Sequence, residues 1–292
     1  MVNKLNYSSI GDVVKIDYQN DIEFDKIHII SSNTQNTWQK TRDFKEKVIN
    51  TKQGKFAEFL VGSLFKMSKS LKYIDYDSFR KDNYKKNAPF DGLLCLNSNP
   101  KTLSIDKLIE LINENVKSSP NGKLNEYTKS IISSFGIKTL EIKSTKVNER
   151  KKLNSFGDER VIILNILKDD FLTYPYFIRE GFFRDYFEYC RFVSKNKFQY
   201  DKSGKEDIDT IRDITKIEFE QMSDIYVRVY IDDPSNSAFI VGYIHKSNFF
   251  SPFPNIKKMV QYKKSEDAIY FSTPLTKAKP ILKIQNDKVL WK

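Results

Sequence analysis

Two short runs that combine apolar and acidic residues constrain the fold of this chain most strongly. The run FDGLLCL covers residues 90–96, and IKTLEIKST covers residues 137–145. The first has the length and apolar character of a buried strand, and the second alternates between apolar and polar residues as a strand does. Charged groups in such strands are costly unless a partner offsets their charge. The two runs therefore predict two strands of a β-sheet. They also predict a partner of opposite charge for the ionised side chains of these strands.

Helical patterns surround these two strands. Over residues 41–67 the apolar residues recur at three- and four-residue steps, which predicts one helix with a weak point at Gly54 or two short helices. Residues 104–116 have an amphipathic helical pattern, and residues 124–135 predict a shorter helix that Gly136 ends.

The remaining patterns extend the sheet. An aromatic stretch at 177–193 predicts a further helix, and two apolar runs joined by the turn-rich DDPSNS predict a pair of strands. The order of helices and strands predicts an α/β fold with a mixed central sheet flanked by helices. Besides the strands at 90–96 and 137–145, the predicted strands are 12–18, 27–30, 72–76, 160–167, 225–232 and 238–245.

Three segments are expected along the chain. Residues 1–40 are expected to form an N-terminal arm, and residues 41–250 the core. Residues 251–292 are expected to form a C-terminal β-rich extension, because Pro and Asn divide this segment into short pieces that are rich in strand-favouring residues. The sequence has no internal repeat at the periods of solenoids or propellers.

The balance of charges favours a polyanionic partner. Lys and Arg number 49 against 38 Asp and Glu, which gives a formal charge of +11. A surplus of this size favours binding to nucleic acid first and to an anionic membrane second. The alternative is that the lysines only keep the protein in solution.

Cysteine usage and hydropathy predict a cytoplasmic protein without a membrane partner. Cys95 and Cys190 stand in apolar surroundings and are too far apart for a CxxC motif, so we expect buried thiols in a reducing compartment. No apolar run approaches the ~18 residues of a membrane span. The first residues also lack the basic-then-apolar order of a secretory signal.

Several catalytic motifs are absent from the sequence. It contains no GxGxxG after a strand, no GxxxxGK[ST] and no GxSxG, which disfavours dinucleotide sites, P-loop sites and a serine-hydrolase elbow. With 2 histidines, a zinc site of the HExxH type cannot be built.

An acidic constellation with a lysine remains. In TLEIKST the strand period places Glu141 and Lys143 on one face, and Leu140 and Ile142 on the other. Asp91 stands at the head of the FDGLLCL strand, where a strand end brings its carboxylate against Glu141. Two carboxylates this close repel each other unless a cation lies between them, and Mg²⁺ prefers hard oxygen ligands. The alternative is an ion-pair network without a metal.

These residues resemble the signature of the PD-(D/E)XK nucleases. In that family an Asp on one strand and a Glu-x-Lys on the next hold Mg²⁺ for phosphodiester hydrolysis, and NAPFDGLLC and TLEIKST are similar to them. The helix GKFAEFLVGSLF is similar to the helix that precedes the Asp in many restriction endonucleases, and Glu58 matches a Glu that often joins the metal site. The resemblance implies Asp91, Glu141 and Glu58 as metal ligands. It implies Lys143 as the residue that positions and helps to deprotonate the attacking water.

The resemblance covers roughly residues 41–170 and implies a restriction-endonuclease-like core with inserted helices. Phe90 separates Pro89 from Asp91, so PFD stands in place of PD. The long connection from Asp91 to Glu141 holds both predicted helices, whereas the simplest family members have a short hairpin there. Residues 97–136 are therefore expected to be an insertion, a recognition or dimer element.

Six residues of two short segments are the expected DNA contacts, namely Lys81, Lys85, Lys86, Ser144, Thr145 and Lys146. The three lysines belong to the loop KDNYKKNAP before Asp91, where ammonium groups steer DNA by releasing counterions from phosphates. The alternative for these lysines is a solvated loop. The other three residues continue the Glu-x-Lys strand, and phosphate contacts are favoured over simple strand termination.

The function expected from the resemblance is a Mg²⁺-dependent endonuclease for double-stranded DNA, with Mn²⁺ as a substitute metal. A type II restriction enzyme that leaves 5′-phosphate and 3′-hydroxyl ends fits best. A palindromic site implies a homodimer, and a cognate methyltransferase is expected to be encoded nearby. The alternatives are a phage-defence or repair nuclease acting on modified, branched or terminal DNA, and a basic DNA-binding protein without catalysis.

Overall fold

The computed structural model describes residues 5–19, 27–33, 43–98, 105–146, 177–182, 219–249, 269–274 and 277–291. The chain divides into two compact units. The first comprises Met1–Ile166, Ser223–His245 and Ala278–Lys292, and the second comprises Leu167–Met222 and Lys246–Lys277. The candidate residues for function that lie in the described part of the chain all belong to the first unit.

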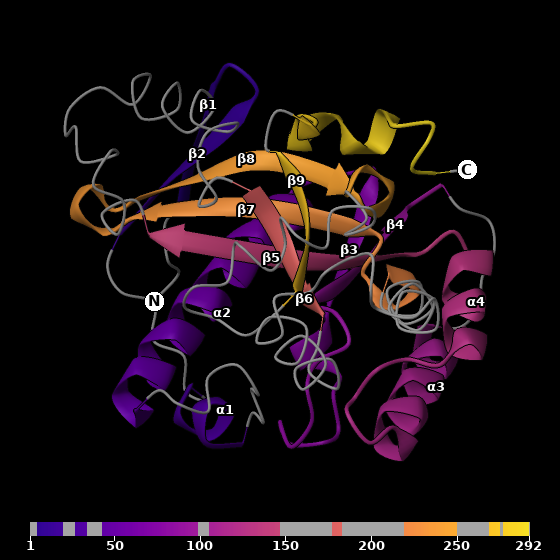
Figure 1. Cartoon of the computed structure of the whole chain (residues 1–292). Helices are drawn as coiled ribbons and strands as arrows, with labels where there is room; N and C mark the ends of the chain where they lie inside the picture. The colour runs from indigo at the N-terminus through magenta and orange to yellow at the C-terminus, as the bar shows by residue number, and fades with distance from the viewer. Residues whose placement is uncertain are drawn as a thin grey trace, which may run out of the picture. The chain divides into compact units, whose positions relative to one another are not determined.

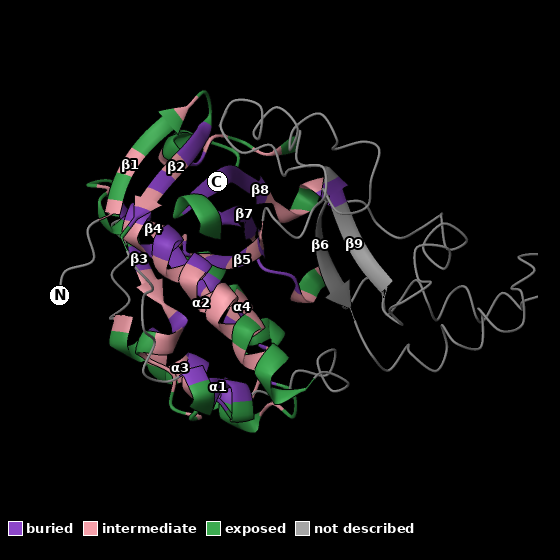
Figure 2. Ribbon diagram, turned by 90° about the vertical axis from the view of Figure 1, so that its left-hand side faces the viewer, coloured by how far each residue is buried: buried purple, intermediate pink, exposed green. Residues whose placement is uncertain are grey.

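A seven-stranded mixed sheet runs through the first unit (Figure 1). Its strands are β1 Leu5–Ile10, β2 Val13–Tyr18, β3 Leu71–Asp75, β4 Gly92–Leu96, β5 Lys138–Lys146, β7 Ile225–Asp232 and β8 Ser237–His245. They follow the order β1-β2-β8-β7-β5-β4-β3, and every neighbouring pair is antiparallel except β5 and β7. The apolar strand β7 is buried along its whole length, whereas the edge strand β1 is partly exposed (Figure 2).

One face of this sheet packs against α2 (Phe44–Lys66). The helix begins at Asp43, whose side chain caps the N-terminus by accepting a main-chain hydrogen bond at 2.7 Å. It runs without a break through Gly54, so the single helix is the form that occurs. Its buried side chains meet Leu140 and Ile142 of β5 in the main core, and they are Ala57, Leu60, Val61, Leu64 and Phe65.

The opposite face of β4 packs against α3 (Ile105–Ser118) and α4 (Glu126–Ser134). Adjacent residues of β4 point to opposite faces, and Leu94 joins the core with α2 while Leu93 joins a second core with α3 and α4. Gly136 has a φ of 64° and ends α4, as predicted. Helices thus flank both faces of a mixed sheet, which confirms the predicted α/β class.

The predicted strand at 27–30 is wrong, because these residues begin helix α1 (Ile27–Asn33). Ile27, Ile30 and Ser31 are buried at helical spacing, and the hydroxyl of Ser31 donates to the carbonyl of Ile27 at 2.7 Å. A short isoleucine-rich run fits both the helical and the strand period, so the sequence pattern alone does not distinguish them.

The predicted helix at 177–193 is wrong over its first part. Phe177–Phe182 forms strand β6, which pairs with β9 (Ile269–Pro274) in a separate two-stranded sheet. Aromatic residues favour strands, and Gly181 is unfavourable inside a helix. The rest of that prediction, and the strand predicted at 160–167, lie outside the described residues.

The last residues of the chain pack on the main core through a 3-10 helix, Ile281–Asn286, where β-type structure was expected. Asp287 anchors this segment, because its Oδ2 accepts hydrogen bonds from Tyr243 at 2.8 Å and from Lys279 at 2.7 Å. The segment therefore belongs to the unit that contains the sheet.

The environment expected for Cys95 is partly met. Cys95 is half-buried, its thiol lies 3.8 Å from the carbonyl of Lys72, and burial raises the pKa of the thiol. Cys190 lies outside the described residues. Among the residues that are described, no helix combines the length and the apolar character needed to cross a membrane.

We expect Gly62→Ala to destabilise the protein and Gly54→Ala, on the same helix, to leave it intact. A Cβ on Gly62 would lie 2.8 Å from the ring of Tyr73, whereas a Cβ on Gly54 would meet no atom within 4 Å. Overpacking costs about 1–3 kcal/mol, while glycine to alanine in an open helix position gains about 0.5–1 kcal/mol. Urea unfolding measures both effects. Equal midpoints for the two variants would contradict the packing of α2 on β3.

Candidate functional site

Asp91 joins β4 to β5 through two hydrogen bonds at the point where β4 begins. Its main-chain N–H donates to the carbonyl of Leu140 at 2.8 Å, and its Oδ2 accepts from the main-chain N–H of Ile142 at 2.6 Å. Both partners flank Glu141 in the chain. The carboxylate of Asp91 is thus fixed against the segment of β5 that carries the Glu-x-Lys residues.

Glu141 and Lys143 share one face of β5. The Nζ atom of Lys143 lies 2.8 Å from Oε1 of Glu141, and the two side chains are 29% and 22% exposed. Leu140 and Ile142 are buried in the core on the other face. The predicted division of the strand into two faces is confirmed, and the charged pair stays accessible to solvent.

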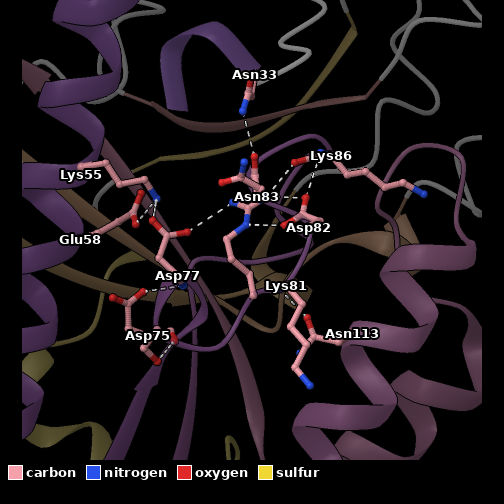
Figure 3. A network of polar contacts seen from close by, with 12 residues as sticks. Asn33, Lys55, Glu58, Asp75, Asp77, Lys81, Asp82, Asn83, Lys86 and Asn113 are labelled. Atoms are coloured by element: carbon pink, nitrogen blue, oxygen red, sulfur yellow. Dashed lines mark hydrogen bonds and ion pairs between the residues drawn. The ribbon is translucent and has the colours of Figure 1, made fainter. Parts of the chain in front are cut away.

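Glu58 comes from α2 and is held by a lysine one helical turn earlier (Figure 3). The Nζ atom of Lys55 lies 2.6 Å from Oε2 of Glu58 and 2.9 Å from Oδ2 of Asp77, which follows β3. The sequence analysis identified Glu58 but missed Lys55 and Asp77. The spacing of Lys55 and Glu58 was a usable sign of an ion pair, whereas the contact with Asp77 depends on the tertiary fold.

Asp91 lies within electrostatic reach of both other carboxylates. Burial raises the pKa of Asp91 well above its ordinary value, and the negative charges of Glu141 and Glu58 raise it further. The charge of Lys55 and the N–H of Ile142 act in the opposite direction. Asp91 therefore interacts electrostatically with Glu58 of α2 and with Glu141 of β5, which is paired with Lys143, and a surplus of negative charge surrounds Asp91.

Lys55 is the cation that counters this surplus from the helix side. Burial alone would lower the pKa of Lys55, but the charges of Glu58, Asp77 and Asp91 raise it above the ordinary value. Burial raises the pKa of Glu58 to about 7 in spite of the attraction of Lys55. Glu58 is consequently poised to gain or lose a proton near neutral pH.

Tyr73 and Asp75 of β3 complete the cluster, and the sequence analysis missed both. The Tyr73 ring lies so close to Gly62 and Gly92 that a Cβ there would approach within 2.8 and 2.5 Å. Its hydroxyl is buried without a hydrogen-bond partner, and burial and the charge of Asp75 raise the pKa of Tyr73. In proteins, a buried polar atom without a protein partner is commonly hydrogen-bonded to an ordered water or contacts an ion.

Arg80 holds the loop that precedes Asp91. Its Nε and Nη2 atoms pair with the carboxylate of Asp82 at 2.7 and 2.9 Å, and Nη1 lies 3.3 Å from Asp77. The guanidinium lies 4.3 Å from the ring centre of Tyr84. The bidentate pair and the ring contact fix the course of the loop next to the acidic cluster.

The three lysines of this loop differ in their surroundings. Lys81 and Lys85 are exposed. The ammonium of Lys86 donates to the carbonyls of Lys117 and Ser119 at the end of α3. That contact stabilises a helix C-terminus, a use of Lys86 that the sequence did not indicate. Contact of the three lysines with DNA stays a prediction.

The residues that follow Lys143 each bond to another part of the chain. The partners are Gln53 for Ser144 (3.3 Å), Arg228 for Thr145 (2.8 Å) and Asp233 for Lys146 (2.6 Å). Thr145 is buried. Their contact with DNA stays a prediction as well.

The donor set is of the kind that Mg²⁺ prefers. Within the described ranges no three His, Cys, Asp or Glu side chains form a group that could hold a metal ion by themselves. Mg²⁺, however, is ordinarily bound through one or two carboxylates, with waters and substrate phosphates as its other ligands. Asp91 and Glu141 supply such carboxylates, and a divalent cation would offset the repulsion between them. The residues therefore fit a two-carboxylate magnesium site.

Comparison of the chain with protein-family models, with curated proteins and with solved structures finds no match. The function proposed below therefore rests on the residues and their geometry.

Glu58→Gln is expected to flatten the pH dependence of stability. The pKa of about 7 lies above the ordinary value of 4.5, so between these values the folded protein keeps a proton that the unfolded chain has lost. Stability is therefore highest below this window and falls as pH rises through it, by about 3 kcal/mol at most. Thermal unfolding in EDTA from acid to neutral pH measures the slope.

The matched control is Glu110→Gln, which changes an exposed residue of α3. It should keep the wild-type slope. Equal slopes in wild type and Glu58→Gln would contradict the buried position of Glu58.

Proposed function

We propose that this protein is a Mg²⁺-dependent endonuclease that hydrolyses phosphodiester bonds of double-stranded DNA with the chemistry of the PD-(D/E)XK family. The observation that carries the proposal is the half-buried carboxylate of Asp91, hydrogen-bonded to β5 and within electrostatic reach of Glu141 and Glu58. Lys143 lies beside Glu141 at 2.8 Å. These are the four residues that the resemblance requires, and they come from elements far apart in the sequence.

The order of the elements supports the same proposal. A helix with Glu58 precedes the strand with Asp91, and the next strand carries Glu141 and Lys143. The two strands, β4 and β5, are antiparallel neighbours in the sheet, in spite of the long connection between them. The two helices of that connection pack in their own core beside the strands, as an insertion would.

Asp91 and Glu141 would hold the Mg²⁺, and Glu58 would join them directly or through a water. Bound there, the ion supplies Lewis-acid polarisation of a phosphate oxygen. Mn²⁺ would substitute, because carboxylate, carbonyl and water ligands suit both ions.

Lys143 would position the attacking water and stabilise the charge that develops on the phosphate. Its pairing with Glu141 leaves the ammonium partly accessible to solvent. In the hydrolysis, the water oxygen bonds to phosphorus and the 3′ oxygen leaves. The products carry a 5′-phosphate and a 3′-hydroxyl.

Within this class we favour a type II restriction enzyme of a bacterial-type cytoplasm. The formal charge of +11 suits a DNA partner. A homodimer and a cognate methyltransferase encoded nearby belong to the same proposal. The segment with α3 and α4 is the candidate for base recognition or for the dimer face.

The first test is cleavage of unmethylated phage DNA with Mg²⁺ and with EDTA. We expect discrete fragments with Mg²⁺ and none with EDTA. Lys143→Ala should reduce cleavage by several orders of magnitude and leave DNA binding largely unchanged, since the lysine serves the transition state. Lys72→Ala, on the edge strand β3, removes an equal charge outside the site and should cleave normally.

The outcomes separate the alternatives. A smear with the same requirements would keep the nuclease but favour a defence or repair role. Full activity of Lys143→Ala, or no cleavage of several DNAs including modified ones, would contradict the proposed chemistry. DNA binding without cleavage would favour a non-catalytic protein.

A second experiment distinguishes the roles of the carboxylates. Asp91→Asn should abolish cleavage, whereas Glu58→Gln should reduce it less if Glu58 acts through a water. Single-turnover rates with increasing Mg²⁺ measure both effects. Equal and total loss in the two variants would make Glu58 a direct ligand.

A further inference from the structure

Arg228 of β7 is a buried cation without an anionic partner among the described residues. It is 7% exposed. Its Nη2 donates to Oγ1 of Thr145 at 2.8 Å, its guanidinium lies 5.1 Å from the ring centre of Tyr230, and its Nε has no hydrogen-bond partner. Neither the hydroxyl nor the ring supplies a negative charge. The hydrogen bond and the ring contact therefore offset only part of the cost of removing the guanidinium from water.

Arg228 lies next to Lys143 in the sheet. β5 and β7 run side by side in parallel (Figure 1), and Lys143 is directly opposite Arg228 in their register. Val227 and Val229, on either side of Arg228, belong to the core with α2. Arg228 therefore projects from the other face, which is the face of Glu141 and Lys143.

The sheet is irregular at this position. Arg228 pairs with Gly242, whereas Val229 pairs with Ile240, so β8 carries one extra residue here. Gly242 has a φ of 152°, and a Cβ there would lie 2.5 Å from the carbonyl oxygen of Lys279. Bulges of this kind occur next to active sites, where they re-aim side chains.

A second buried arginine shows what a structural role requires. Arg80 has a side chain that is 6% exposed, and it is paired with the carboxylates of Asp77 and Asp82. Lys143 is already paired with Glu141, and no carboxylate of the described chain pairs with Arg228. Within the described ranges the charge of Arg228 is thus left without a counter-charge.

We propose that Arg228 is a phosphate-binding residue of the site, and that it binds a phosphate group of the DNA beside Lys143. The DNA part of this inference rests on the proposed nuclease function, whereas the anion site rests on Arg228 and its own surroundings. A phosphate supplies both the missing charge and an acceptor for the unpartnered Nε. Guanidinium binds phosphate through two parallel hydrogen bonds, which an ammonium cannot do.

Inorganic phosphate in EDTA tests the anion site without DNA or metal. We expect phosphate to raise the Tm of the wild-type protein, because it binds the folded state. Arg228→Met should lose this shift, and Arg228→Lys, which keeps the charge but not the planar group, should retain only part of it. Lys72→Met is the matched control for one lost charge and should keep the full shift.

The Tm without phosphate distinguishes a binding role from a structural one. Arg228→Met removes an uncompensated buried charge and should keep or raise the Tm. Arg80→Met leaves two carboxylates without their partner and should lower it. A Tm loss in Arg228→Met as large as that in Arg80→Met, or a phosphate shift that survives in Arg228→Met or is complete in Arg228→Lys, would overturn the inference.

DNA affinity, measured by fluorescence anisotropy with Ca²⁺ in place of Mg²⁺, tests the substrate. Arg228→Met should weaken binding on the order of tenfold to a hundredfold, as expected for one charge-assisted contact. The slope of log Kd against log salt should fall by about one. Unchanged affinity and slope would show that this phosphate is not that of DNA.

The failures of the two proposals differ. A phosphate shift that depends on Arg228 in a protein that neither binds nor cleaves DNA would leave the anion site and remove the nuclease. Mg²⁺-dependent cleavage that is normal in Arg228→Met would leave the nuclease and remove the role of Arg228.

Discussion

The hydrogen bonds that Asp91 makes across β4 and β5 fix the arrangement on which the site depends. The ladder between these strands has three residue pairs, from Gly92 opposite Leu140 to Leu94 opposite Lys138. Asp91 extends it by one main-chain bond and one side-chain bond. Because an acidic side chain replaces a main-chain acceptor, a carboxylate is fixed inside the protein at the end of the strand. The other charged groups of the cluster are arranged around that carboxylate.

The fold tolerates this cluster at a cost in stability. Burial, together with the charge of Asp77, raises the pKa of Glu58 to about 7 although Lys55 acts in the opposite direction. Arg228 adds a positive charge on the adjacent strand that no carboxylate of the described residues pairs with. Opposite charges held apart in this way do not stabilise the folded chain by themselves. A divalent cation and a phosphate group would together satisfy both, which links the proposed metal to the proposed substrate.

Much of the candidate site followed from local patterns. Strand alternation put Glu141 and Lys143 on one face, and an acidic residue on an apolar helix pointed to Glu58. The sequence did not reveal Lys55 and Asp77 as partners of Glu58, because that contact joins a helix to the end of a strand. The sequence also did not reveal a role for Arg228, because in the sequence it is a single charged residue within the apolar run of β7. Only the parallel pairing of β5 with β7 brings Arg228 next to Lys143.

The sequence by itself determined the α/β class, the helical character of the segment that forms α2, most of the described strands and the division of β5 into a buried and a charged face. These features depend on periodicity over a few residues, which a single sequence records. The tertiary structure alone decided the helix at Ile27–Asn33, the strand at Phe177–Phe182 and the order of strands in the sheet. It alone also decided which charges meet. These features depend on contacts between segments that are distant in the sequence. The free energy of such contacts cannot be inferred from the local pattern of residues.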